Sequence, residues 1–143
     1  MRPKLLLRIA AVIMLLHALG HTMGVITWKK PESHVPPDLV KQMVEQRFIF
    51  MGSDRSIADF YDGFGYASTI ALLLIVFLLW LVSGLTQANA GIARKILIPV
   101  LLFLIFLAID ELIFFFPFAA SFTLVSAALT CIAILLVNKP VSQ

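Results

Sequence analysis

Four long apolar runs, separated by polar stretches, set the hydrophobic pattern of this chain. Each run has about the 20 residues that a helix needs to cross a hydrocarbon core roughly 30 Å thick. The predicted spans are 5–27, 64–83, 96–116 and 118–137, with a turn at Pro117 between the last two. Backbone polar groups in lipid must be paired within each segment, and the runs lack the alternation of barrel strands, so we expect helices. The pattern predicts a single all-α transmembrane domain over residues 1–143: an integral membrane four-helix bundle made of two helical hairpins.

The only long polar stretch, residues 28–62, forms the predicted outer loop between the first two spans. Asp38 follows two prolines and is predicted to cap a short amphipathic helix. The apolar positions of this helix fall on one side at helical spacing: Leu39, Val40, Met43, Val44 and Phe48. We expect the helix to lie flat in the membrane interface, with Gly52 ending the segment. Ser56-Ile-Ala-Asp59 then reads as a capping box for the second span.

The composition supports a membrane location and excludes several other classes. Hydrophobic residues make up 61% of the chain and charged residues only 13%, whereas a soluble domain is about 45–50% apolar. The excess apolar surface must face lipid, so the bilayer is an expected partner. The net charge of +3 comes from scattered bases without a basic helix, which argues against nucleic acid as a partner. Cys131 is the only cysteine, so an intrachain disulfide and a Cys-x-x-Cys redox pair are both excluded.

Basic residues beside the helix ends predict the orientation of the chain. With the N-terminus inside, the inner segments hold Arg2, Lys4, Arg8, Arg94, Lys95 and Lys139, and the outer loop holds Lys29, Lys30, Lys41, Arg47 and Arg55. The inner bases lie in short segments, where the positive-inside bias is strongest. We therefore expect both termini in the cytoplasm and the protein in a bacterial inner membrane. Arg2 and Lys4 before an apolar run are also compatible with a cleaved signal peptide, but we expect the first helix to be retained.

Ionisable residues within the predicted spans are the candidates for chemistry, because charge inside a membrane is costly. His17 and His21 are four residues apart and share one face of the first helix. Asp110 and Glu111 are adjacent on the third helix and point about 100° apart, so only one can face the bundle axis. Counted from the inner ends, the histidines rise about 18 and 24 Å and the acids about 21 and 22 Å. The four groups lie at one level, in the outer third of the membrane.

This pattern admits three interpretations. A His-x-x-x-His pair with a carboxylate from another helix supplies three ligands for a divalent metal, with His17, His21 and Glu111 as the predicted set. The same groups are suited to sharing protons. They also serve, in the purely structural interpretation, as hydrogen-bonded links between two helices.

Asp62 and Tyr66, at the outer end of the second span, extend the predicted ligand-binding set of His17, His21, Asp110 and Glu111. Asp62 and its neighbour Asp59 have a second interpretation as acids that the helix dipole favours in a first turn. Ser126 and Thr130 share a face of the fourth helix and are interpreted as marks of close helix packing.

Two short sequence segments resemble segments of the small bacterial four-helix membrane proteins grouped as DoxX-like. They are His17-Ala-Leu-Gly-His21-Thr-Met-Gly24 and Leu81-Val-Ser-Gly-Leu85. The order of helix, outer loop with an amphipathic segment, and three further helices is also similar. The resemblance implies membrane redox or accessory roles and no established active site, so no functional residue is carried over from it.

Three functions are consistent with these features. The first is a binding or accessory protein whose outward-facing pocket takes a divalent metal or a small lipophilic ligand. The second is a membrane enzyme that uses the same histidines and acids for proton transfer or redox chemistry on a lipid-soluble substrate such as a quinone or an isoprenoid. The third is a structural subunit of a membrane complex or homo-oligomer. No motif in the sequence decides whether the protein is an enzyme.

Overall fold

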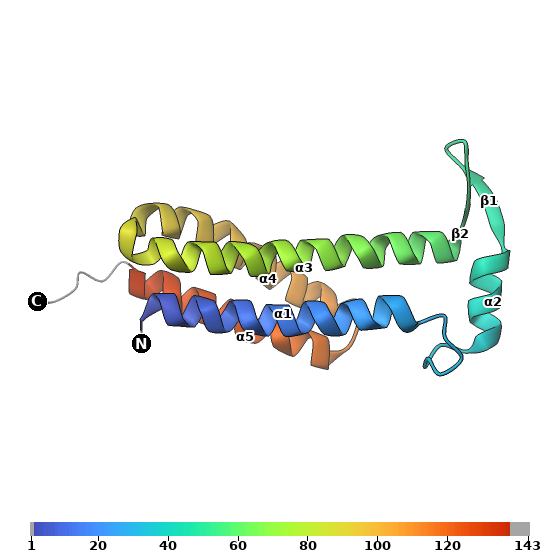
Figure 1. Cartoon of the computed structure of the whole chain (residues 1–143), viewed down its shortest axis with the longest axis horizontal. Helices are drawn as coiled ribbons and strands as arrows, with labels where there is room; N and C mark the ends of the chain where they lie inside the picture. The colour runs from blue at the N-terminus through green and yellow to red at the C-terminus, as the bar shows by residue number, and fades with distance from the viewer. Residues whose placement is uncertain (1, 138–143) are drawn as a thin grey trace, which may run out of the picture. The chain divides into compact units, whose positions relative to one another are not determined.

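The computed structural model describes residues 2–137, and within that range the chain is mainly helical. Its long helices are α1 (Pro3–Thr27), α3 (Ile57–Ala88), α4 (Ala90–Phe114) and α5 (Pro117–Val137) (Figure 1). All four are long and apolar enough to cross a membrane. The predicted all-α class with four spanning helices is therefore confirmed. Lys139, one of the predicted inner bases, lies outside the described residues.

The helices extend beyond the apolar runs that predicted them. α3 begins at Ile57 instead of residue 64 and ends at Ala88 instead of residue 83, and α4 begins at Ala90 instead of residue 96. Hydropathy marks the part of a helix that lies in hydrocarbon, but hydrogen bonding continues until a cap ends it. Asn89 is such a cap, because its side chain accepts from the backbone N–H of Ile92 at 3.0 Å.

The segment between α1 and α3 corrects part of the prediction. Its helix is α2 (Pro37–Glu45), and Asp38 lies inside the first turn instead of capping it; Pro36 holds the N-cap position and makes no side-chain cap bond. Phe48 is not helical. It belongs to β1 (Arg47–Phe50), which pairs antiparallel with β2 (Ser53–Ser56). Met51 and Gly52, both with positive φ, form the turn that joins β1 to β2, so Gly52 lies in a hairpin turn and does not end a helix.

The capping box before the second span is confirmed. The backbone N–H of Ser56 donates to Asp59 Oδ2 at 2.9 Å, and the backbone N–H of Asp59 donates to Ser56 Oγ at 3.2 Å. This reciprocal pair satisfies donors that the first turn of a helix would otherwise leave open. The strand β2 therefore leads into α3 without an intervening loop.

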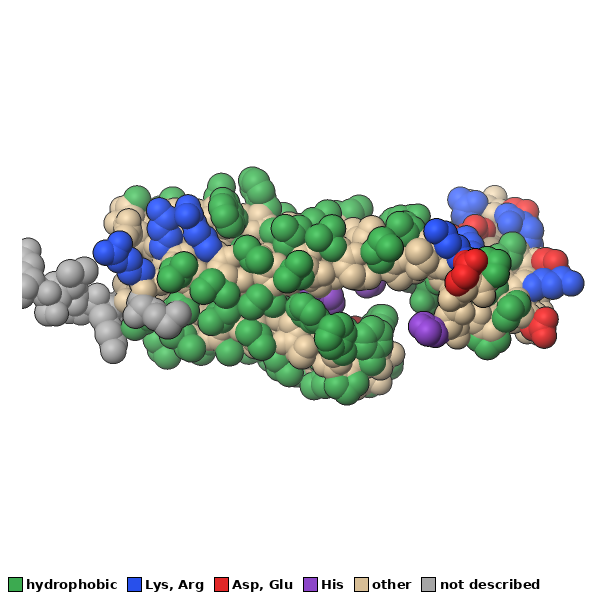
Figure 2. Space-filling view, turned by 60° about the horizontal axis from the view of Figure 1, so that its bottom comes forward, with side chains coloured by type: hydrophobic (Ala, Val, Ile, Leu, Met, Phe, Trp, Pro, Cys, Tyr) green, Lys and Arg blue, Asp and Glu red, His purple; other side chains and the backbone are tan. Residues whose placement is uncertain are grey.

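The chain divides into two structural units. Among the described residues, one unit comprises residues 2–17 and 72–137, and the other comprises residues 18–71. In the first unit, α4 turns back into α5, and the first part of α1 and the second part of α3 pack with them (Figure 1). Its core is a set of buried apolar side chains: Leu6, Leu7, Ala10, Met14, Leu79, Val82, Leu97, Leu104, Ala108, Ala120 and Ala133. Hydrophobic side chains also cover the helix surfaces that would face lipid. Acidic side chains gather over the segment between α1 and α3, whereas basic side chains lie both there and on the long helices of the first unit (Figure 2).

Polar residues on α5 mark close packing, as predicted. Ser126 and Thr130 are fully buried, and Ser126 Oγ donates to the backbone carbonyl of Ala10 on α1 at 3.4 Å. Such a contact requires the two helices to approach closely, which the small residues on both helices allow.

Candidate functional site

The first unit buries a histidine–glutamate pair, formed by His17 of α1 and Glu111 of α4. His17 Nε2 lies 3.3 Å from Glu111 Oε1, and the two side chains are only 8% and 7% exposed. On α1, His17 continues the buried stripe of Leu7, Ala10 and Met14 at the three- and four-residue spacing of a helix face. The sequence therefore places the imidazole where a core leucine would otherwise be.

Glu111 and Asp110 have opposite environments, as their adjacent positions predict. The buried stripe of α4 runs through Ala93, Leu97, Val100, Leu104 and Ala108, and Glu111 follows at the next position of that stripe. Asp110 is exposed. Of the two acids, Glu111 is the one that faces the core and meets His17.

Thr123 of α5 completes the group. Its hydroxyl oxygen lies 3.2 Å from His17 Nδ1 and is fully buried. The sequence interpretation missed this residue, although it lies on the same helix face as Ser126 and Thr130. The ring of Phe122 lies beside the imidazole, with the two ring centroids 5.8 Å apart. Three helices therefore supply the polar groups of one site.

The group can hold a proton in more than one arrangement. When His17 is neutral with Nε2–H donating to the carboxylate, the Thr123 hydroxyl donates to Nδ1. When a proton is added, either both ring nitrogens donate or the protonated glutamate donates to Nε2, and the Thr123 hydroxyl then accepts from Nδ1–H. A hydroxyl both donates and accepts, so every arrangement stays hydrogen-bonded. The site is thus suited to proton exchange within a buried environment.

One oxygen of the site has no partner. Glu111 Oε2 is buried, and no hydrogen bond to this atom is found within residues 2–137, although the Thr123 hydroxyl also interacts with the Glu111 carboxyl group. Buried acceptors are satisfied in the great majority of native structures, because an unsatisfied one loses its hydration without compensation. This oxygen is therefore the place at which an additional donor would be stabilised.

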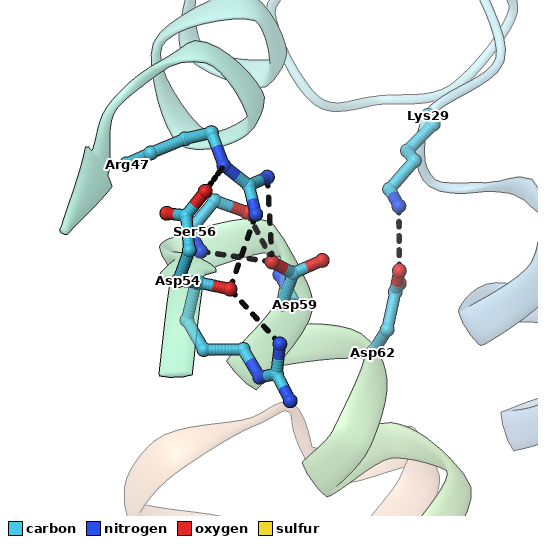
Figure 3. A network of polar contacts seen from close by, with 7 residues as sticks. Lys29, Arg47, Asp54, Ser56, Asp59 and Asp62 are labelled. Carbon is cyan, nitrogen blue, oxygen red and sulfur yellow. Dashed lines mark hydrogen bonds and ion pairs between the residues drawn. The ribbon is translucent and has the colours of Figure 1, made fainter. Parts of the chain in front are cut away.

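His21 and the outer residues of the predicted set have other neighbours, all within the second unit. His21 is half-buried and its Nε2 lies 3.1 Å from the backbone carbonyl of Gly65 on α3. Because a carbonyl only accepts, Nε2 carries the proton and donates. Asp62 accepts from Trp28 Nε1 at 2.8 Å. It also accepts from Lys29 Nζ at 2.5 Å (Figure 3). Tyr66 is half exposed.

The contact of His21 with Gly65 depends on a close approach of α1 and α3. A methyl group added at Gly65 would lie 2.8 Å from Cγ2 of Val25, whereas one added at Gly63 would meet nothing within 4 Å. We expect Gly65→Ala to lower the free energy of unfolding by about 1–3 kcal/mol, since overpacking forces the helices apart. Gly63→Ala, in the same helix, should be neutral or stabilising by up to about 1 kcal/mol. Unfolding in mixed micelles measures both, and equal effects of the two variants would contradict the close approach.

The predicted metal centre gains no support from the geometry. Across residues 2–137, no group of three or more histidine, cysteine, aspartate or glutamate side chains is placed to hold a metal ion. The set of His17, His21 and Glu111 stays a prediction. The structure brings His17 and Glu111 together, leaves Asp110 exposed, and engages His21 and Asp62 in hydrogen bonds to other groups.

The comparisons with known proteins place no constraint on this assignment. No family model, no curated protein and no solved structure matches the chain.

Proposed function

We propose that this polytopic membrane protein binds a small lipophilic ligand at the pair formed by His17 and Glu111, in a binding or accessory role. The observation that carries the proposal is the buried, unpartnered Oε2 of Glu111. A ligand that presents a hydroxyl or amine hydrogen to this oxygen would satisfy it. The apolar side chains around the site, among them Phe122, suit a ligand whose remaining surface is hydrophobic.

A contribution to stability does not by itself explain why His17 and Glu111 are buried as a pair. Taking a carboxyl and an imidazole out of water costs free energy that their mutual attraction often fails to recover, and apolar replacements of similar volume are frequently as stable. Charged groups within membrane spans are, for this reason, functional candidates. A helix contact alone would be served by residues such as the neighbouring alanines and leucines.

The ligand is identified by what the purified protein retains. The protein is purified in mild detergent, extracted with organic solvent, and the extract is analysed by mass spectrometry. Glu111→Gln places an amide donor where the ligand's donor would bind, so we expect about a tenfold lower amount of retained ligand, the effect of losing one hydrogen bond to a charged group. Asp110→Asn, at the exposed neighbouring position, is the matched control and should retain the wild-type amount.

Equal retention by Glu111→Gln and wild-type protein would contradict the proposal. Elemental analysis of the same preparations tests the predicted divalent metal on His17, His21 and Glu111, and a stoichiometric metal lost in His17→Ala would favour that alternative.

The second candidate function is proton transfer or redox chemistry on a lipid-soluble substrate such as a quinone. It is favoured by the continuous contact from Thr123 through His17 to Glu111, which accommodates a proton in several arrangements. A binding protein returns its ligand unchanged, whereas an enzyme converts it. Incubation of the retained molecule with fresh protein, followed by mass spectrometry, separates the two.

The cellular setting is part of the proposal. The bases Arg2, Lys4, Arg8, Arg94 and Lys95 support cytoplasmic termini, and the helix count suits a bacterial inner membrane. A DoxX-like relationship is proposed on the two short sequence segments and on the order of the helices. A role as a structural subunit is the third candidate, supported by the large apolar helix surfaces, and it would be recognised by a partner that co-purifies at fixed stoichiometry.

A further inference from the structure

A groove of about 320 Å³ runs along the outer end of α3, at a distinct place from the site of the proposed function. Its lining residues are Arg55, Asp59, Phe60, Gly63, Phe64 and Ala67. The five helical residues recur at spacings of three and four, so they form one face of α3. Arg55 comes from the adjacent strand β2, at the end of the groove where the helix begins.

The length of α3 places this groove at the level of lipid headgroups. With 32 residues, the helix is about 48 Å long, whereas the hydrocarbon core is roughly 30 Å thick. Aromatic residues are enriched at the boundary between lipid and water, and α3 carries Phe60, Tyr61, Phe64 and Tyr66 within its first turns. The groove therefore descends from the headgroup layer at Arg55 toward the hydrocarbon at Ala67.

The hairpin extends the aromatic wall of the groove. Phe48 and Phe50 point to the same side of β1 and both contact Phe60, with ring centroids 6.0 Å and 5.4 Å apart. Phe60 in turn lies 6.5 Å from Phe64. Arg55 is the cross-strand partner of Phe48, so its side chain shares that side of the sheet. Aromatic side chains, small residues and one guanidinium thus meet on one exposed surface.

The two charged residues at the mouth of the groove, Arg55 and Asp59, differ in the partners that they already have. Arg55 donates to the backbone carbonyl of Asp54 at 2.9 Å, and no carboxylate within residues 2–137 lies at ion-pair distance from it. Arg47 instead pairs with Asp54 at 2.9 Å, and the hydrogen bond and charge of Asp54 raise the pKa of Arg47 (Figure 3). Asp59 accepts the Ser56 N–H and lies 3.7 Å from Arg47. The groove itself therefore presents one cation and one anion.

We propose that this groove binds one phospholipid of the surrounding leaflet that carries a zwitterionic, amine-bearing headgroup. The phosphate lies at Arg55, the ammonium group at Asp59, and an acyl chain follows the surface of Gly63 and Ala67. A guanidinium recognises phosphate oxygens through several donors in a fixed plane. The paired opposite charges of the lining match a headgroup of zero net charge better than an anionic one. The glycine and alanine leave the depth that a hydrocarbon chain needs.

Native mass spectrometry after reconstitution tests the proposal with defined lipids. The protein is reconstituted with equal amounts of phosphatidylethanolamine, phosphatidylglycerol and diacylglycerol, released in mild detergent, and its retained lipids are counted. Wild-type protein should retain one phosphatidylethanolamine, about tenfold more often than diacylglycerol, as expected for a hydrogen-bonded phosphate contact. Arg55→Gln should remove this preference over diacylglycerol. Asp59→Asn keeps an oxygen for the capping bond and should remove the preference over phosphatidylglycerol.

A groove-filling variant separates specific retention from general lipid contact. Gly63→Leu meets nothing within 4 Å at its Cβ and improves helix propensity, so it should fold and fill the groove. We expect it to lose the retained phosphatidylethanolamine. Gly84→Leu, in the same helix and equally free of contacts, is the matched control and should keep it. Equal retention of all three lipids by wild-type protein, or unchanged retention in Gly63→Leu, would overturn the proposal without affecting the site at His17.

Discussion

Replacement of His17 by leucine is expected to lower the free energy of unfolding by about 3 kcal/mol. The change leaves the buried Glu111 carboxyl without the imidazole 3.3 Å away, and removing one partner of a buried pair typically costs about 3–5 kcal/mol. Protonation of the glutamate recovers part of that loss, so we expect the lower end of the range. The measurement is unfolding in mixed micelles with increasing sodium dodecyl sulfate, followed by the fluorescence of the tryptophans.

The double variant His17→Leu with Glu111→Leu is the decisive control. With both polar groups gone, no uncompensated carboxyl remains, and the two leucines continue the apolar stripes of α1 and α4. We expect the double variant to be within about 1 kcal/mol of the wild-type protein, or more stable. The variants His17→Leu and Glu111→Leu are also measured singly. If the double variant were destabilised by the sum of the two single effects, the two groups would not be coupled, and the result would contradict their role as one pair in the proposed site.

The spanning helices follow from the lengths of the apolar runs, whereas helical periodicity alone leaves open which of the two acids faces inward. An apolar run of about 20 residues without the alternation of barrel strands has few alternatives to a membrane helix, because helices and closed barrels are the structures that satisfy the backbone in lipid. Periodicity also limits the inward-facing acid to one of two, and the stripe that ends at Ala108 and Glu111 assigns it. The spacing of His17 and His21 on one face was correct, but their partners depend on the register between helices, which the sequence does not specify.

Thr123 and the hairpin show why other features were missed. A hydroxyl in a membrane helix usually bonds to its own backbone, as Thr130 does to the Ser126 carbonyl at 2.8 Å, so composition does not reveal which one reaches another helix. In the outer loop, the apolar pattern from Leu39 to Phe48 fits a helix throughout. In the structure, the end of this pattern belongs to the strand β1. The strand forms because Met51 and Gly52, two consecutive residues with positive φ, reverse the chain and allow β1 to pair with β2.

The second large effect is expected from Trp28→Ala, at the start of the segment between α1 and α3. Trp28 is 5% exposed, donates to Asp62 at 2.8 Å and lies 4.6 Å from the ring of Tyr61. It therefore holds the start of the outer loop against α3, together with the ion pair of Lys29 and Asp62. Removal of a buried tryptophan costs about 3–5 kcal/mol, through lost burial and an unfilled cavity. The loop should then open far more often than in the wild-type protein.

Limited proteolysis in proteoliposomes measures this opening. Trypsin cleaves after lysine and arginine except before proline, and the loop offers Lys29, Lys41, Arg47 and Arg55 as sites. When opening and closing are fast, the cleavage rate follows the population of the open state, so about 3 kcal/mol corresponds to roughly a hundredfold faster cleavage. Trp80→Ala is the matched control, because Trp80 is 50% exposed on the membrane portion of α3. Cleavage in that variant should stay within about fivefold of wild type, consistent with a cost below about 1 kcal/mol for a half-exposed side chain. Similar acceleration in both variants would show that loss of tryptophan loosens the whole chain, and that Trp28 has no particular role in closing the loop.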